Sequence, residues 1–146
     1  MKLPDYVTVE EVRRVCRELK IRDWTKLKKP EVTLKEAKII LPHVNTENLK
    51  ISPENFRLGL EVELEHGTMF KRLNVTNNHP ILTGKIVMAH FMEMLDYYKR
   101  LQVAEVEGDI LKAVVAKNMQ KIQKYYRKLA GARMELGRTE TSQLKG

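Results

Sequence analysis

Apolar residues recur along most of this chain at steps of three and four, the spacing of one face of an α-helix. Two helix starts carry the same signal: Thr8 and Thr33 are each followed three residues later by a glutamate, Glu11 and Glu36. This arrangement is a capping box, in which both side chains bond the free amides of the first turn. Ser52-Pro53 predicts a third start, since serine is a favoured cap and proline a favoured first residue.

Proline and glycine predict where these helices end. Pro42 should end the second helix, because proline disfavours helical geometry in the residue before it. Gly67 should close the third helix, which runs from Glu54 to about His66, in a left-handed turn. The pattern then predicts a helix from Pro80 to about Leu101, another over Val106–Leu136 with a break at Gly108, and a polar tail of ten residues.

No segment shows a strand pattern that competes with these helices. We therefore expect an all-α single domain, residues 1–146, of four to five helices. Its parts are N-terminal helices with an insertion (7–46), a central antiparallel helix pair (52–101), and a long basic C-terminal helix with its tail (102–146).

The charged residues are unevenly distributed along the 146 residues of the chain. The formal net charge is +8, with 27 Lys and Arg against 19 Asp and Glu. Residues 51–100 are neutral, whereas residues 1–50 and 101–146 each carry +4. Cys16 is the single cysteine, so no disulfide forms within one chain. No apolar run approaches the ~20 residues of a membrane span, and the N-terminus lacks the pattern of a secretion signal. We expect an intracellular protein, in a host cytoplasm or a virion if the source is viral.

Two glutamate–histidine pairs are the main candidates for chemistry. Glu63 and His66 are three residues apart on one predicted helix, and His90 and Glu93 repeat the spacing in reverse on the next. An antiparallel pair of helices can bring them face to face if the two helices overlap with a stagger, and two imidazoles with one or two carboxylates suit Zn²⁺, or else Fe or Mn. Supporting roles around the metal would fall to three further side chains, Glu65, Asp96 and Tyr97.

A simpler interpretation of the same residues needs no metal. His66 would then hydrogen-bond the end of its helix, His90 would be a satisfied core histidine, and Glu65 would be solvated. The bundle pattern of di-iron proteins also requires a second forward Glu-x-x-His unit, which this chain lacks. No serine-nucleophile, phosphate-loop or Cys-x-x-Cys motif is present either. A non-enzymatic protein is therefore favoured, and a metal-binding protein or metal-dependent hydrolase is the alternative.

The C-terminal third contains a long basic segment. Between residues 112 and 133 there are seven basic residues and no acidic ones: Lys112, Lys117, Lys121, Lys124, Arg127, Lys128 and Arg133. Such a helix could lie along phosphate backbones, an acidic protein surface or anionic lipid headgroups. It could equally be the solvated face of an amphipathic core helix. No motif for reading a specific base sequence is present.

The middle of the chain resembles a known family. The matching segments are Gly59-Leu60-Glu61-Val62-Glu63-Leu64-Glu65-His66-Gly67, Asn74-Val75-Thr76, Pro80, Thr83-Gly84-Lys85-Ile86, Ala89-His90, Glu93 and Asp96-Tyr97-Tyr98. They are similar to a domain of unknown function found in small proteins of bacteria, phages and large DNA viruses. Asp23-Trp24 also resembles a dipeptide of that family, and the likeness covers about residues 7–24 and 52–101.

The resemblance implies a compact helical domain, a phage-like or virus-like origin, and no particular activity. It groups Glu63, Glu65, His66, His90 and Asp96, whereas Asn78-His79 replaces an acidic pair of the family. Together with the basic outer thirds, it favours a structural or interaction protein, such as a component of a viral or phage particle. We expect protein assembly partners or nucleic acid to bind the C-terminal helix.

Overall fold

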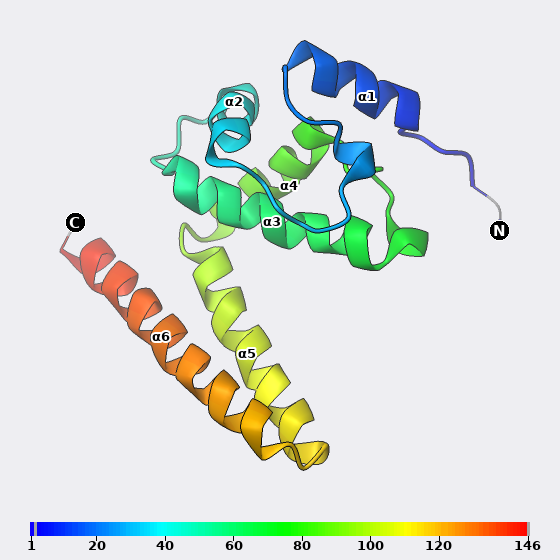
Figure 1. Ribbon diagram of the computed structural model, residues 1–146. Coiled ribbons are helices and arrows are strands. Elements are labelled where there is room, and N and C mark those ends of the chain that lie inside the picture. Colours follow the sequence, from blue (N-terminus) through cyan, green and yellow to red (C-terminus); the bar gives the residue numbers. More distant parts are fainter. Residues whose placement is uncertain (2, 146) are drawn as a thin grey trace. The chain divides into compact units, whose positions relative to one another are not determined.

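The computed structural model describes residues 1 and 3–145 (Figure 1), and in this range the secondary structure is entirely helical. The prediction of an all-α protein is confirmed, although the described residues form six α-helices where four to five were predicted. The helices are α1 (Val9–Glu18), α2 (Leu34–Val44), α3 (Pro53–Met69), α4 (Pro80–Glu93), α5 (Tyr97–Val115) and α6 (Met119–Leu144). Two single turns of 3₁₀ helix, η1 (Trp24–Lys26) and η2 (Lys71–Leu73), lie between them.

The contacts of the chain divide it into two compact units, Met1–Met92 and Glu93–Gly146. The first unit holds α1 to α4 except for the final residue of α4, and the second holds α5 and α6.

The three predicted helix starts of the first unit are confirmed. Thr8, Thr33 and Ser52 each accept a hydrogen bond from the amide three residues on, at 3.2 Å in every case. The capping box is complete at Thr33, where the Glu36 carboxylate also accepts from the Thr33 amide. The carboxylate of Glu11 instead binds the guanidinium of Arg14, one turn further along α1.

Pro42 does not end its helix, contrary to the prediction. It lies exposed within α2, which continues to Val44 and ends where the Asn45 amide bonds the Leu41 carbonyl. Val44 is buried in the core of the first unit. Burial of the Val44 side chain stabilises the last turn of α2, although Pro42 cannot donate a backbone hydrogen bond there.

Gly67 does not close α3 either, and this prediction was also wrong. The helix runs through Gly67 to Met69, and no glycine of the described residues has a positive φ. Gly67 is buried against the side chains of Asn74 and Asn78, and a Cβ added there would lie 1.8 Å from Asn78 Oδ1. Glycine is therefore required here for space and not for backbone conformation.

The core of the first unit forms around Trp24, Phe56 and Leu60, which are fully buried. Helix α2 packs along α3, and α4 crosses behind α3 in the view of Figure 1. Gly84 allows the close approach of α4, because a Cβ at this position would meet Ile40, Val44 and Phe56 at 3.1–3.3 Å. The Thr83-Gly84-Lys85 segment thus serves helix packing.

The C-terminal boundaries differ from the prediction. The helix expected to reach Leu101 ends at Glu93, and α5 passes through Gly108 without a break. The break falls at Ala116–Asn118 instead, and α6 then includes most of the predicted tail. A lysine, Lys117, takes the left-handed conformation at this break, with a φ of 53°. Glycine is the usual residue for such a position, so a turn at Lys117 could not be predicted from its residue type.

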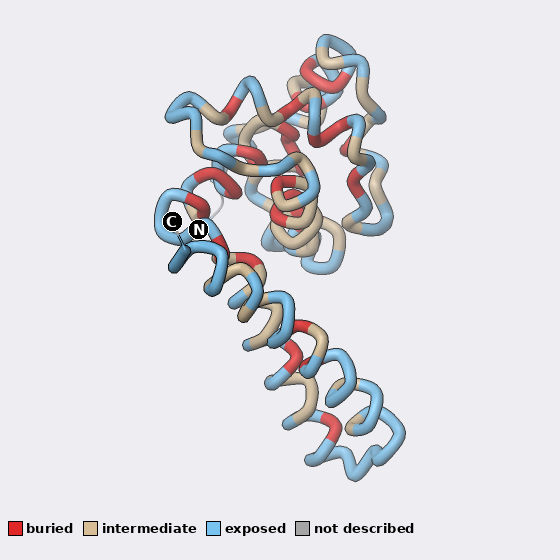
Figure 2. The backbone as a smooth tube through the Cα atoms, turned by 90° about the vertical axis from the view of Figure 1, so that its left-hand side faces the viewer, coloured by how far each residue is buried: buried red, intermediate tan, exposed pale blue. Residues whose placement is uncertain are grey.

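Helices α5 and α6 form an antiparallel hairpin. Lys99 Nζ donates to Thr139 Oγ1 at 2.6 Å near its open end, and Arg133 pairs with Glu107 at 3.3 Å nearer the turn. The inward residues of both helices recur at steps of three and four: Val103, Val106, Ile110 and Ala113 on α5, and Ile122, Tyr125, Leu129 and Ala132 on α6. Figure 2 shows how narrow this buried seam is and how exposed the rest of the hairpin is.

Candidate metal centre and candidate binding surface

Three of the predicted metal-site residues come together in the first unit. Glu63 on α3 lies between two histidines: its Oε1 is 3.1 Å from Nδ1 of His90 on α4, and its Oε2 is 3.8 Å from Nδ1 of His66. The Glu63 side chain is 10% exposed and that of His90 is 26% exposed, whereas that of His66 is 68% exposed. One residue from each predicted pair, Glu63 and His90, is therefore in contact with the other in the structure.

The structure gives the other predicted members of this site the following local surroundings. Glu93 is the exposed last residue of α4, and Glu65 is half-buried on α3. Asp96 is buried in the second unit, where it binds Arg100 through both oxygens at 2.8 and 2.9 Å. Tyr97 packs edge-on against Tyr98, with ring centroids 5.1 Å apart. Among residues 1 and 3–145, no three or more His, Cys, Asp or Glu side chains are arranged to hold a metal ion.

The loop before α4 contains two structural residues that the sequence did not reveal. His79 Nδ1 accepts hydrogen bonds from the amides of Ile81 and Leu82, at 3.2 and 3.3 Å, and so caps α4. Its buried position lowers the pKa of the imidazole, although the carboxylate of Glu11 opposes the shift. Asn78 accepts from the Asn74 amide group and donates to the Trp24 carbonyl. Asn78 and His79 thus hold this loop in place.

Glu36 forms a second buried polar network. It binds the Arg22 guanidinium through both oxygens, at 2.9 and 2.7 Å, and accepts from Trp24 Nε1 at 3.2 Å. Burial opposes ionisation, but these donors and the Thr33 amide outweigh it and lower the pKa of Glu36 to about 2. The capping pattern predicted its bond to Thr33, but the bonds to Arg22 and Trp24 depend on the tertiary fold.

The predicted basic residues lie on the α5–α6 hairpin, and all seven are exposed. Lys112 pairs with Asp109 at 3.5 Å and Arg133 with Glu107 at 3.3 Å. The other five form no ion pair with any acidic group of the described residues, and we call them the unpaired cations: Lys117, Lys121, Lys124, Arg127 and Lys128.

The helical period determines where the unpaired cations point. Lys121, Lys124 and Lys128 are separated by three and four residues, so they share one face of α6. That face lies beside the inward positions Tyr125 and Leu129, and hence along one flank of the hairpin. Lys117 adds a fourth charge at the turn itself.

The turn of the hairpin also exposes aliphatic side chains. Val114 and Val115 in the last turn of α5 are 51% and 76% exposed, and Met119 at the start of α6 is 64% exposed. Leu111, one turn earlier on α5, is 65% exposed. We call these four residues the apolar tip. The charges of this segment can be identified from the sequence, but the apolar tip could not be, because the turn was not predicted.

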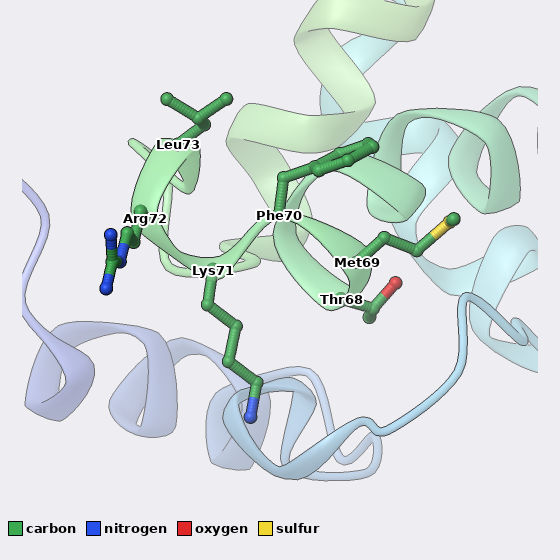
Figure 3. Close-up of a pocket in the computed structure, with 6 residues that line it drawn as sticks. All are labelled: Thr68, Met69, Phe70, Lys71, Arg72 and Leu73. Atoms are coloured by element: carbon green, nitrogen blue, oxygen red, sulfur yellow. The ribbon is translucent and has the colours of Figure 1, made fainter.

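The first unit has an exposed apolar region of its own, at the end of α3. A groove of about 540 Å³ is lined by residues 68–73, with Met69, Phe70 and Leu73 exposed. Figure 3 shows Lys71 and Arg72 directed away from Met69 and Phe70.

Elsewhere in this unit Cys16 is 2% exposed, and burial raises the pKa of its thiol. A buried thiol with a raised pKa is a poor nucleophile.

Comparison with known proteins assigns a family. Residues 12–107 match the family model described as a protein of unknown function, DUF5661. This range covers both the Glu63–His90 contact and the start of α5. No curated protein and no solved structure matches the chain significantly. None of the described helices is both long enough and apolar enough to cross a membrane.

Proposed function

Because the chain belongs to the DUF5661 family, whose description assigns no function, we propose one from its own structure. The protein is an interaction protein whose C-terminal helical hairpin docks onto an acidic macromolecular surface, either nucleic acid or an acidic protein. The five unpaired cations are the observation that supports it. They lie exposed on one end of a hairpin on which Arg100, Lys112, Arg133 and Arg138 have acidic partners.

The close spacing of these cations destabilises the protein itself. Lys124 and Lys128 are one helical turn apart, and like charges at this spacing destabilise a helix by a few tenths of a kcal/mol. The same helix shows how such charge is otherwise balanced, because Arg138 pairs with Glu135 at 2.8 Å. An external acidic partner would provide the missing compensation.

A salt titration tests this proposal. The full chain should bind a mixed-sequence DNA duplex and polyglutamate at low salt, and should release both as salt rises. For five phosphate contacts, the slope of log affinity against log salt would be on the order of −4. Replacing Lys121, Lys124 and Lys128 by glutamine should reduce both the affinity and the slope.

A matched variant separates position from total charge. Lys35, Lys38 and Lys50 are exposed lysines of the first unit, and replacing them by glutamine also lowers the formal net charge from +8 to +5. This control should bind like the wild type. Equal binding by the two triple variants would contradict docking through the hairpin.

The resemblance described above adds a narrower form of the proposal, in which the partner belongs to a viral or phage particle. Recovery of the protein from purified particles would support this form. Its absence from particles would leave docking in place with a cellular partner.

A metal-dependent function is the second candidate, and the position of Glu63 between two imidazoles favours it. Glu63, His66 and His90 would have to move together to bind one Zn²⁺, since these described side chains are not so arranged in the structure. The bound ion would then keep an open position for water, as a hydrolase requires. Metal analysis of protein purified without chelator tests it. One equivalent of metal, lost in both His66→Ala and His90→Ala, would support the site, and metal-free wild-type protein would contradict it.

A further inference from the structure

The chemistry at the turn of the α5–α6 hairpin combines positive charge with exposed aliphatic side chains. Charge alone fits any polyanion, but the apolar tip gains nothing from phosphate groups or carboxylates. A DNA duplex presents its charged backbone to a basic helix, and Val115 and Met119 would remain in water there. A partner that accounts for both features has to offer anionic groups and an apolar region directly beneath them.

The shape of the hairpin turn limits the kinds of partner that could contact the apolar tip. Three residues, Ala116–Asn118, connect the two helices, and three aliphatic residues lie within two positions of them: Val114, Val115 and Met119. The aliphatic side chains therefore project from the narrow end of a hairpin and not from a broad face. An interface between two proteins usually requires a broad complementary surface, whereas a narrow apolar end can enter the headgroup region of a bilayer.

Charge complementarity supports the same occupant. Lys112, Lys117, Lys121 and Lys124 flank the apolar tip, and no acidic residue occurs between residues 110 and 134. Basic residues next to an inserting apolar segment are the pattern by which proteins recognise anionic lipid surfaces. We infer that the hairpin turn binds anionic bilayers, with the lysines on the headgroups and the apolar tip inserted between them. This inference rests on the proposed docking of the hairpin onto acidic surfaces, and it adds anionic lipid to the surfaces that the hairpin binds.

Vesicle binding tests the inference with a matched pair of variants. The full chain should bind vesicles of phosphatidylcholine with 30% phosphatidylserine, and bind pure phosphatidylcholine at least tenfold more weakly. The double variant Val115→Ser/Met119→Ser should lose at least tenfold in affinity for the anionic vesicles while retaining its binding to a DNA duplex. Both side chains are exposed, so the variant should keep the stability of the hairpin.

The first unit supplies the control. Val75 and Met69 are 83% and 66% exposed, close to the 76% and 64% of Val115 and Met119. The variant Val75→Ser/Met69→Ser therefore removes the same side chains at similar exposure, and it should bind vesicles like the wild type. If both double variants bind like the wild type, insertion of the apolar tip is excluded. If both lose affinity equally, the specific role of the hairpin turn is excluded.

The depth to which the hairpin turn inserts into the bilayer can be measured separately. A tryptophan in place of Met119 should show blue-shifted emission on anionic vesicles and quenching by brominated lipid. A tryptophan in place of Met134, which is 53% exposed further along α6, should show neither change. The native Trp24 is fully buried, so it adds only a constant background.

The remaining outcomes separate this inference from the proposed function. Binding to DNA or polyglutamate without binding to anionic vesicles overturns the lipid partner and leaves docking intact. Failure to bind any of these probes overturns both. Equal binding to neutral and anionic vesicles overturns the role of the lysines.

Discussion

Two lysines of this protein occupy a backbone conformation that usually belongs to glycine. Lys20 after α1 and Lys117 after α5 have φ values of 54° and 53°. In both turns the amide of the residue after the lysine donates to the carbonyl of the third-last residue of the helix, Ile21 to Cys16 and Asn118 to Ala113. This is the Schellman arrangement. A residue with a Cβ pays roughly 1 kcal/mol for this conformation.

Replacing either lysine by glycine should therefore stabilise the protein. We expect Lys20→Gly and Lys117→Gly each to raise the free energy of unfolding by up to about 1 kcal/mol, since the greater freedom of glycine in the unfolded chain offsets part of the gain. Denaturant titration measures this change. The two variants should differ in binding, because only Lys117→Gly removes one of the unpaired cations. A loss of stability in both would contradict the strain argument.

The same residues explain why the hairpin turn could not be predicted. The sequence offered Gly108 as the break, yet a Cβ at Gly108 would meet no atom within 4 Å and α5 passes straight through it. The actual turn carries lysine at the left-handed position, where local sequence signals indicate nothing. Asn118, which caps α6 by accepting from the Lys121 amide at 3.0 Å, was the one available sign.

At the scale of the helix, the predicted starts were more reliable than the predicted ends. Thr8, Thr33 and Ser52 act on amides within three residues, so local sequence is enough to identify them. The ends depend on tertiary contacts. Val44 is buried, and α2 extends beyond Pro42 to include it. Asn74 and Asn78 pack against Gly67, and α3 extends beyond this glycine to Met69.

Alanine substitutions at two helical glycines should therefore have opposite effects. Gly67→Ala should destabilise the first unit by about 1–3 kcal/mol, because its Cβ would overlap the Asn78 side chain. Gly137→Ala in α6 should stabilise the hairpin by about 0.5–1 kcal/mol, because a Cβ there meets nothing within 4 Å and alanine favours helix. Denaturant titration of both variants measures the changes. Tolerance of alanine at position 67 would show that the loop moves aside at little cost.

At the scale of the whole molecule, the sequence predicted part of the candidate metal site. The approach of Glu63 and His90 followed from the reversed spacing on two helices, which a hairpin brings together. The places of Asp96 and Tyr97 did not follow, because the predicted helix over residues 80–101 is in fact two helices separated at 94–96. Helical phase is lost across such a break, so spacing cannot assign these residues to one face.

The polar groups with shifted pKa values also predict how the protein responds to acid. His79 caps α4 only as a neutral imidazole, and its pKa is lowered, so the folded state resists protonation. The unfolded chain takes up that proton below about pH 6.5, and stability should begin to fall there. Glu36 has a pKa of about 2 in the folded protein against 4.5 for a free side chain, so its contribution is complete above pH 4.5 and is lost as pH falls to about 2.

The loss from Glu36 should be on the order of 3 kcal/mol, and it belongs to the first unit. Trp24 donates a hydrogen bond to Glu36 and is the single tryptophan, so its fluorescence follows this unit. Circular dichroism at 222 nm follows all the helices, including α5 and α6. On acidification, the Trp24 signal should change before most of the helical signal is lost. Glu36→Gln should lower stability at pH 7 and flatten its decline between pH 4.5 and 2, whereas Glu18→Gln, at an exposed ion pair, should leave the profile unchanged. A wild-type protein equally stable at pH 7 and pH 3 would contradict the role assigned to the Glu36 network.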